Sequence, residues 1–296
     1  MQAIPTETEG SDPAPHPTVK GKAGAQTRFR LGTDPRALAS DRRRIEQDLR
    51  QALTARTLTL HFQPRYSLAD RQCFGAEALL RWPHRKRGLI APAVFLPIAE
   101  RSELIVPLGG WVLSQACRIA AHWPVPAGAL GSIVSVNIAA RQLRGAALLG
   151  QIAEALEASG LDAERLELEF TESMLVDGDA DTLLALSAIR DLGIGIALDD
   201  FGTGYASLSM LKRLPLTALK LDRSLIRDLP ADEEDAAIVR AVVQTAHVMG
   251  MAVAAEGIET EGQCRFLASV GCDQGQGFLF NPALPAEQVS RVLHGG

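Results

Sequence analysis

The stretch Ile196-Ala197-Leu198-Asp199-Asp200-Phe201-Gly202-Thr203-Gly204-Tyr205-Ala206-Ser207-Leu208 is the part of the sequence that most constrains the fold. The apolar run over 194–198 predicts a buried strand. This strand ends in two adjacent carboxylates, and the two glycines that follow allow a tight bend before a helix that begins near Ser207. Adjacent acids at the end of a buried strand repel each other, and a hard divalent cation would compensate their charge. An Asp-Asp pair is also typical of a helix cap followed by a turn, so the rest of the chain has to decide between the two.

The composition favours a soluble globular protein with a substantial core. Of the 296 residues 47% are hydrophobic, and the mean hydropathy is +0.06. The net charge of −5 argues against binding to a nucleic-acid polymer, which normally requires a basic surface. Residues 1–30 lack the apolar segment of a signal peptide, and no apolar run is long enough to span a membrane. We therefore expect a cytoplasmic protein, with reduced thiols at Cys73, Cys117, Cys264 and Cys272.

The first 40 residues are rich in Pro, Gly, Thr and charged residues and poor in large apolar ones. Such a segment cannot bury enough surface to offset its chain entropy, so we predict a disordered arm over 1–40 that is able to contact a regulatory protein. A single domain is expected over 41–296. Asp41 is the expected N-cap of its first helix, which would run to Ala55.

Strands and helices alternate roughly eight times through this domain. Strands are predicted at 57–62 (ending at Gln63-Pro64), 73–81, 132–137, 166–172, 194–198, 219–222, 252–256 and 277–280. Helices are predicted at 41–55, 109–122, 180–192, 231–249 and 259–270, before Gly160, after Ser207 and from Pro285. This order is typical of an α/β protein with a (β/α)8 TIM-like barrel, and a doubly wound sheet is the alternative.

A polar residue stands at or near the C-terminal end of seven of these strands. In a barrel those ends converge on one mouth, where catalysis takes place. The seven residues are Glu77, Asn137, Glu169, Asp199, Lys220, Glu256 and Gln276.

The charge of this set indicates a metal site. Its carboxylates, with Asp200 and Lys220, carry a net charge of −4 when ionised, and two divalent ions would balance that charge. The ligands are all oxygens, which favours Mg²⁺ or Mn²⁺ over Zn²⁺. Such a site suits phosphoester hydrolysis, in which Lys220 would orient the water or neutralise developing charge. A metal-dependent aldolase or isomerase stays open on these grounds, because fold does not imply function.

Seven motifs, in order across about 45–290, resemble those of the EAL-domain cyclic di-GMP phosphodiesterases. They are Gly75-Ala76-Glu77-Ala78-Leu79-Leu80-Arg81-Trp82, Ser135-Val136-Asn137-Ile138-Ala139, Glu167-Leu168-Glu169-Phe170-Thr171-Glu172, Asp199-Asp200-Phe201-Gly202-Thr203-Gly204-Tyr205, Leu219-Lys220-Leu221-Asp222, Ala255-Glu256-Gly257-Ile258-Glu259 and Gln276-Gly277-Phe278-Leu279-Phe280. The resemblance implies a barrel whose first strand is antiparallel to the others. It also implies hydrolysis of cyclic di-GMP to linear pGpG with two Mg²⁺ or Mn²⁺ ions.

The resemblance further implies a role for each matching residue. Glu77, Asn137, Glu169 and Asp199 match the primary metal ligands, and Asp200 matches the ligand of the second metal. Lys220 matches the residue that contacts the nucleophilic water. Glu256 and Gln276 match the positions that make the remaining contacts to metal, water and substrate, and Glu256 is also expected to be catalytic. Gln63 and Arg81 match substrate-binding positions. Glu172 matches the residue that braces the loop over 201–207, which in the family leads to a homodimer interface.

Some positions depart from the family pattern. The family usually has a basic residue before proline near its end, whereas this chain has Asn281-Pro282-Ala283. In addition, Ala206 stands where serine is common, and Glu103 stands where glycine is common. None of these removes a metal ligand. Three alternatives remain: an inactive cyclic di-GMP receptor, an interaction module that uses the helix at 41–55, and an unrelated metal-dependent lyase.

Overall fold

The computed structural model describes residues 35–125, 131–145, 147–175, 179–204 and 207–294. The disordered arm predicted over 1–40 lies outside these ranges except for 35–40, which are helical. Tyr205 and Ala206 also lie outside them. No helix in the described ranges combines the length and the apolar character that crossing a bilayer requires.

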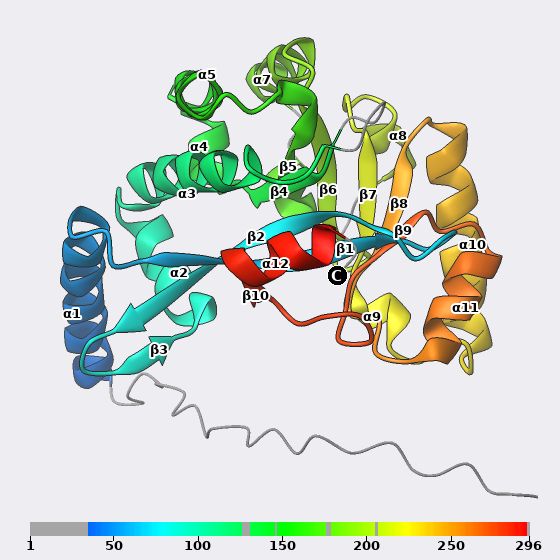
Figure 1. Cartoon of the computed structure of the whole chain (residues 1–296), viewed down its shortest axis with the longest axis horizontal. Helices are drawn as coiled ribbons and strands as arrows, with labels where there is room; N and C mark the ends of the chain where they lie inside the picture. Colours follow the sequence, from blue (N-terminus) through cyan, green and yellow to red (C-terminus); the bar gives the residue numbers. More distant parts are fainter. Residues whose placement is uncertain (1–34, 126–130, 146, 176–178, 205–206, 295–296) are drawn as a thin grey trace, which may run out of the picture.

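Eight strands of the described chain close into a barrel (Figure 1). Six of the junctions between neighbours are parallel, from β2 through β9, and β1 is antiparallel to both β2 and β9. The antiparallel first strand and the TIM-like barrel are therefore confirmed. The barrel strands are β1 (Thr59–Ser67), β2 (Cys73–His84), β4 (Ile133–Asn137), β5 (Leu166–Thr171), β6 (Gly195–Phe201), β7 (Ala218–Leu221), β8 (Ala252–Ala255) and β9 (Gln274–Gly275).

Two short strands extend the sheet outside the closed barrel. β3 (Gly88–Ile90) forms a hairpin with the end of β2, and β10 (Leu284–Pro285) pairs with β1. Because β10 brings the C-terminal segment back to β1, the last helix lies beside the first strand (Figure 1).

Helices surround the barrel (Figure 1). The predicted helix end at Gly160 is confirmed, whereas α10 and α11 begin later than the predicted 231 and 259, each after a side-chain cap. The carboxylate of Asp232 caps α10, Thr260 and Gln263 form a capping box on α11, and Gly160 ends α5 in the left-handed conformation at φ 68°. The helices are α1 (Pro35–Thr54), α2 (Pro92–Arg101), α3 (Ile105–Ala120), α4 (Ala140–Leu143), α5 (Leu148–Ser159), α6 (Glu172–Leu175), α7 (Ala180–Asp191), α8 (Leu208–Leu211), α9 (Arg223–Ile226), α10 (Glu233–Val248), α11 (Glu261–Ser269) and α12 (Ala286–Leu293).

The N-terminal helix belongs to the same core as the barrel. Ile45 and Leu49 of α1 are fully buried, and α1 packs against α2. In the barrel wall, Trp82 of β2 packs edge-on against Phe95 of α2, with 5.4 Å between the ring centroids. Burial of large apolar side chains of this kind is the main contribution to folding, so α1 is an integral element of the domain.

Two predicted element ends on the N-terminal side are wrong. α1 begins at Pro35 rather than Asp41, because proline is favoured in the first turn of a helix, where its missing N–H is not needed. β1 continues through Pro64 to Ser67. The edge of β1 that does not pair with β2 pairs with β10 at His61 and Phe62 and with β9 at Tyr66 and Ser67. Pro64 lies between these two pairings, where a missing N–H is tolerated.

The last predicted strand is also misplaced. β9 is Gln274–Gly275, and the apolar run over 277–280 forms a turn, with the Phe280 N–H donating to the Gly277 carbonyl. A Cβ on Gly277 would lie 2.1 Å from the carbonyl oxygen of Ile258, so glycine permits a backbone contact that ends the strand early.

Candidate active site

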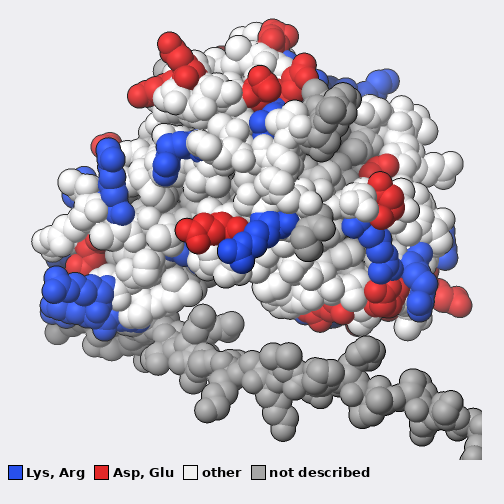
Figure 2. Space-filling view, in the orientation of Figure 1, with Lys and Arg blue, Asp and Glu red and all other residues white. Residues whose placement is uncertain are grey.

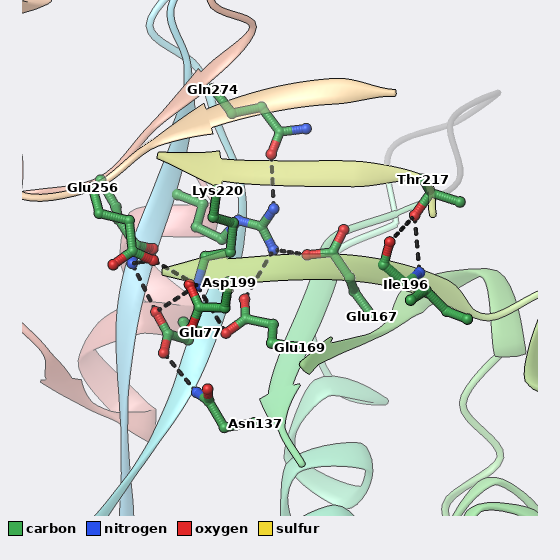
Figure 3. Close-up of polar contacts among 12 residues, drawn as sticks. Glu77, Asn137, Glu167, Glu169, Ile196, Asp199, Thr217, Lys220, Glu256 and Gln274 are labelled. Carbon is green, nitrogen blue, oxygen red and sulfur yellow. Dashed lines mark hydrogen bonds and ion pairs between the residues drawn. The ribbon is translucent and has the colours of Figure 1, made fainter. Parts of the chain in front are cut away.

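The strand-end residues meet at the mouth of the barrel, around the ammonium of Lys220. Figure 3 labels all of them except Gln276, whose amide reaches the group by hydrogen bonds to Glu77 and Glu256. Lys220 extends from β7 and is 1% exposed. Its Nζ lies 2.5 Å from Glu256 Oε1 and 2.8 Å from Glu169 Oε2. Asp199 Oδ1 and Glu77 Oε2 follow at 3.2 and 3.6 Å. One buried cation therefore contacts four carboxylates that come from four different strands or strand ends.

Two amides fix the orientation of these acids. Asn137 Nδ2 donates to Glu77 Oε1 at 2.8 Å, and Gln276 Nε2 donates to Glu77 Oε2 at 2.7 Å. Gln276 Nε2 also lies 3.1 Å from Glu256 Oε1. The carboxylate of Glu77 is thus held at both oxygens by neutral donors, which leaves its charge intact.

The electrostatics divide the acids into two kinds. Burial alone would raise the pKa of Glu77, but Lys220 and the hydrogen bonds from Gln276 and Asn137 hold that pKa below its usual range. For Glu169, burial and the nearby charge of Glu77 raise the pKa well above its usual range. Burial also raises the pKa of Glu256 to about 7. Lys220 stays charged: burial would lower its pKa, but the surrounding carboxylates, Glu169 foremost, raise it well above the usual range.

Asp200 differs from its neighbour Asp199. Its backbone has φ 57°, a left-handed conformation that is uncommon outside glycine, and the register between β6 and β7 shifts between Leu198 and Phe201. This bulge leaves Asp200 half-buried, beside the Lys220 cluster and not within it. Burial and the charge of Asp199 raise the pKa of Asp200.

Of the three expected substrate-binding residues, Gln276 lies within the cluster, and Gln63 and Arg81 lie at the edge of the mouth. Arg81 and Asn137 line a cavity of about 1410 Å³ that extends between α2, the start of α3 and α4. Burial lowers the pKa of the Arg81 guanidinium, whose Nη1 donates to the carbonyl of Leu80. Gln63 Nε2 lies 3.4 Å from the backbone oxygen of Asn281. Arg81 therefore borders open space, whereas the Gln63 amide contacts the loop that follows β9.

Glu172 begins α6 directly after β5 and is buried. A Cβ placed on Gly204 would lie 2.8 Å from Glu172 Oε1. The carboxylate thus packs closely against the loop that follows β6, which is the contact that the predicted bracing role requires.

A second polar layer lies in the barrel interior beside the cluster around Lys220, and the sequence analysis missed it. Arg65 of β1 is 2% exposed, and its Nη1 lies 2.5 Å from Glu167 Oε1. Its Nη2 donates to Gln274 Oε1 at 2.7 Å (Figure 3). The sequence did contain a signal for Glu167, because it alternates with Glu169 in β5 and must face the same side. Arg65 was missed because β1 was expected to end before it.

The donors at the mouth fit a hard divalent cation. Both oxygens of Glu169 are buried: Oε2 faces the Lys220 ammonium at 2.8 Å, Oε1 has no hydrogen-bond donor among the described residues, and the surrounding ligand atoms are oxygens. The acids point at Lys220, however, and no three His, Cys, Asp or Glu side chains in the described ranges are grouped closely enough to hold an ion as they stand. To bind an ion, some carboxylates would have to turn away from the ammonium.

The fold and the site together define a TIM-like barrel with a mouth lined by acids around one buried lysine. The family model of the EAL domain matches residues 46–283, and the chain therefore belongs to the EAL domain family. MucR of Pseudomonas aeruginosa, a bifunctional diguanylate cyclase/cyclic di-GMP phosphodiesterase, is 44% identical over 254 residues, which are 86% of this chain and 37% of MucR. The cyclic di-GMP phosphodiesterase NbdA of the same organism is 42% identical over 255 residues, 86% of this chain and 32% of NbdA.

The chain thus spans about a third of the length of these curated relatives. Among solved structures, the phosphodiesterase of MucR in complex with c-di-GMP is 44% identical, with a TM-score of 0.78 over 83% of this chain and 99% of that one. The EAL enzyme Bd1971 in its cAMP- and cyclic-di-GMP-bound form is 30% identical, with a TM-score of 0.79 over 86% of this chain and 69% of that one.

Proposed function

We propose that this domain hydrolyses cyclic di-GMP to linear pGpG with the help of two Mg²⁺ or Mn²⁺ ions. The observation that carries the proposal is the cluster of four carboxylates on Lys220 at the mouth of the barrel. The relatives supply the substrate class, since MucR and NbdA are described as acting on cyclic di-GMP. Family membership supports the use of a divalent metal, and the all-oxygen donor set fits one.

The residues that would hold the ions are Glu77, Asn137, Glu169 and Asp199 for the first and Asp200 for the second, with Glu256 beside them. Divalent ions at such a site lower the pKa of a water molecule and neutralise charge on a phosphate. The amides of Asn137 and Gln276 would keep Glu77 ionised and oriented for this role, as their hydrogen bonds to both of its oxygens indicate.

The protein's own groups would move the proton and balance the charge. Lys220, whose ammonium lies among the four carboxylates at the mouth, would orient the attacking water and offset the negative charge that develops on the phosphate. Glu256 contacts Lys220 at 2.5 Å and would accept hydrogen bonds from the ammonium and from a water molecule held at the mouth. Arg81, at the edge of the cavity, would hold a phosphate of the dinucleotide, and Gln63 would contact it at the loop after β9.

The proposal extends to control of the site. Glu172 would brace the loop after β6, and through that loop the mouth would respond to a second copy of the chain. A regulatory protein bound to the arm over 1–40 would act on α1, which is packed into the core.

The test is a chromatographic assay of the purified chain with cyclic di-GMP and Mn²⁺ or Mg²⁺, with EDTA in a matched sample. We expect pGpG to accumulate only with metal. Tight binding without product would replace the proposal with the receptor function. If the chain neither binds nor hydrolyses the dinucleotide, it is an interaction module.

A further inference from the structure

Arg65 is a second buried cation next to the cluster around Lys220. Its guanidinium is anchored on two strands at once, by Glu167 of β5 at 2.5 Å and by Gln274 of β9 at 2.7 Å (Figure 3). A planar guanidinium with two occupied nitrogens cannot rotate freely, so its charge has a fixed position in the barrel. The third near group is Glu169, whose Oε1 lies 4.0 Å from Arg65 Nη1.

Glu169 therefore lies between two cations. Lys220 contacts its Oε2 at 2.8 Å, and Arg65 faces its Oε1. The distance of 4.0 Å is too long for a hydrogen bond, and Oε1 has no donor among the described residues. Arg65 thus attracts the carboxylate through its charge while leaving the lone pairs of Oε1 free to bind an ion.

The two cations differ in what metal binding demands of them. Lys220 contacts the same oxygens that an ion would need, so the ammonium competes with the ion for them. Arg65 is held by Glu167 and Gln274, which have no part in the proposed ligand set, and its position need not change when an ion binds. It can therefore steady Glu169 in both situations.

We propose that Arg65 is a positioning residue that holds Glu169 in place for a divalent ion at the mouth of the barrel. The proposal rests on the metal chemistry proposed above. Its readout is metal affinity, measured by titration calorimetry with Mn²⁺ alone, so it can be tested whether or not the domain turns over cyclic di-GMP.

The most informative variant replaces Arg65 and its ion-pair partner Glu167 at the same time. Arg65→Met alone would leave Glu167 buried without its partner, which endangers the fold. The double variant Arg65→Met with Glu167→Leu replaces both charges with apolar groups of similar size, and exchanges of this kind are often well tolerated. We expect its Mn²⁺ affinity to fall about 10- to 100-fold, the range typical for loss of a residue that orients a metal ligand. Arg65→Lys keeps the positive charge but not the planar guanidinium that bonds Glu167 and Gln274 at once, so we expect a smaller loss of Mn²⁺ affinity.

Arg165→Met is the matched control. Arg165 is also a buried arginine, at 3% exposure, but its guanidinium donates to the carbonyls of Ser132 and Ala120 and contacts none of the proposed ligands. We expect Arg165→Met to lower the midpoint of thermal unfolding. Its Mn²⁺ affinity should stay within about twofold of that of the unaltered domain, because a substitution that contacts no metal ligand changes binding by no more than this.

Three results would overturn the proposal. The first is wild-type Mn²⁺ affinity in a folded double variant. The second is an equal loss of affinity in Arg165→Met, which would trace the effect to general loosening of the barrel. The third is the absence of Mn²⁺ binding by the unaltered domain, which would remove the two-metal function as well. Mn²⁺ binding without hydrolysis would overturn only the proposed phosphodiesterase function. The Mn²⁺ affinity of the double variant relative to that of the unaltered domain would still decide the role of Arg65.

Discussion

Replacing Lys220 with methionine tests how the mouth of the barrel balances its charge. The ammonium contacts four carboxylates, with atom distances from 2.5 to 3.6 Å, and no other cation of the described residues lies so close to them. Removing one partner of a buried ion pair costs about 3–5 kcal/mol, because the other charge is left uncompensated. A typical domain has about 5–15 kcal/mol of stability, so this loss is a large fraction.

Divalent ions should reverse much of that loss. An ion that binds only the folded state adds about 2.7 kcal/mol at a concentration 100 times its dissociation constant. Without Lys220 the ion has no competitor for the oxygens of Glu169 and Asp199. We therefore expect Mn²⁺ to stabilise Lys220→Met more than it stabilises the unaltered domain, while kcat falls at least about 100-fold.

The measurement is urea unfolding, followed by tryptophan fluorescence, in EDTA and in millimolar Mn²⁺. Lys212→Met is the control, because Lys212 is exposed and a surface change of this kind costs within about 0.5 kcal/mol. The reasoning is refuted if Lys220→Met and the unaltered domain have the same unfolding free energy in EDTA.

Three further predictions concern the acids and the loop. Glu77→Ala should abolish metal-dependent turnover, because both amide donors lose their acceptor; residual turnover above about 10% in the chromatographic assay would contradict the assignment. Gly204→Ala places a Cβ 2.8 Å from Glu172, so we expect a weaker Mn²⁺ dependence and about 1–3 kcal/mol less stability; Gly150→Ala, where a Cβ meets nothing within 4 Å, is its control. In EDTA the pKa of Glu256 is about 7 in the folded state against 4.5 ordinarily, so between these values the folded state holds a proton that the unfolded chain lacks. Through this group the stability should therefore fall as the pH rises through this window, by up to about 1.4 kcal/mol per unit. In urea titrations Glu256→Gln should remove that contribution and leave the one from Glu169, whose pKa is also raised.

The alternation of apolar runs and caps was enough to predict most of the barrel. Asp232 and Thr260 cap helices by local hydrogen bonds, and Gly160 ends one by its left-handed backbone, so these boundaries depend on neighbours in the sequence. The errors occurred where distant segments set the ends. β1 extends past Pro64 because β9 pairs with its last residues, and β9 ends early because Gly277 meets the backbone of Ile258.

The sequence by itself predicted which polar residues gather at the mouth of the barrel. A polar residue at the end of each parallel strand must reach one mouth, since all those strands point the same way, and the structure brings Glu77, Glu169 and Lys220 together as this rule requires. Motif order added the direction of β1, which hydrophobic periodicity does not contain.

Only the tertiary structure decided how the charges are arranged inside the barrel. Arg65 and Glu167 are 102 positions apart, and nothing local in either segment indicates that they meet. The same holds for the group of four carboxylates around one ammonium. There, burial raises the pKa of Glu256, whereas Lys220 and two amide hydrogen bonds outweigh burial and lower the pKa of Glu77. The physical reason is that Coulomb energies depend on distance and burial, and closure of the barrel sets both.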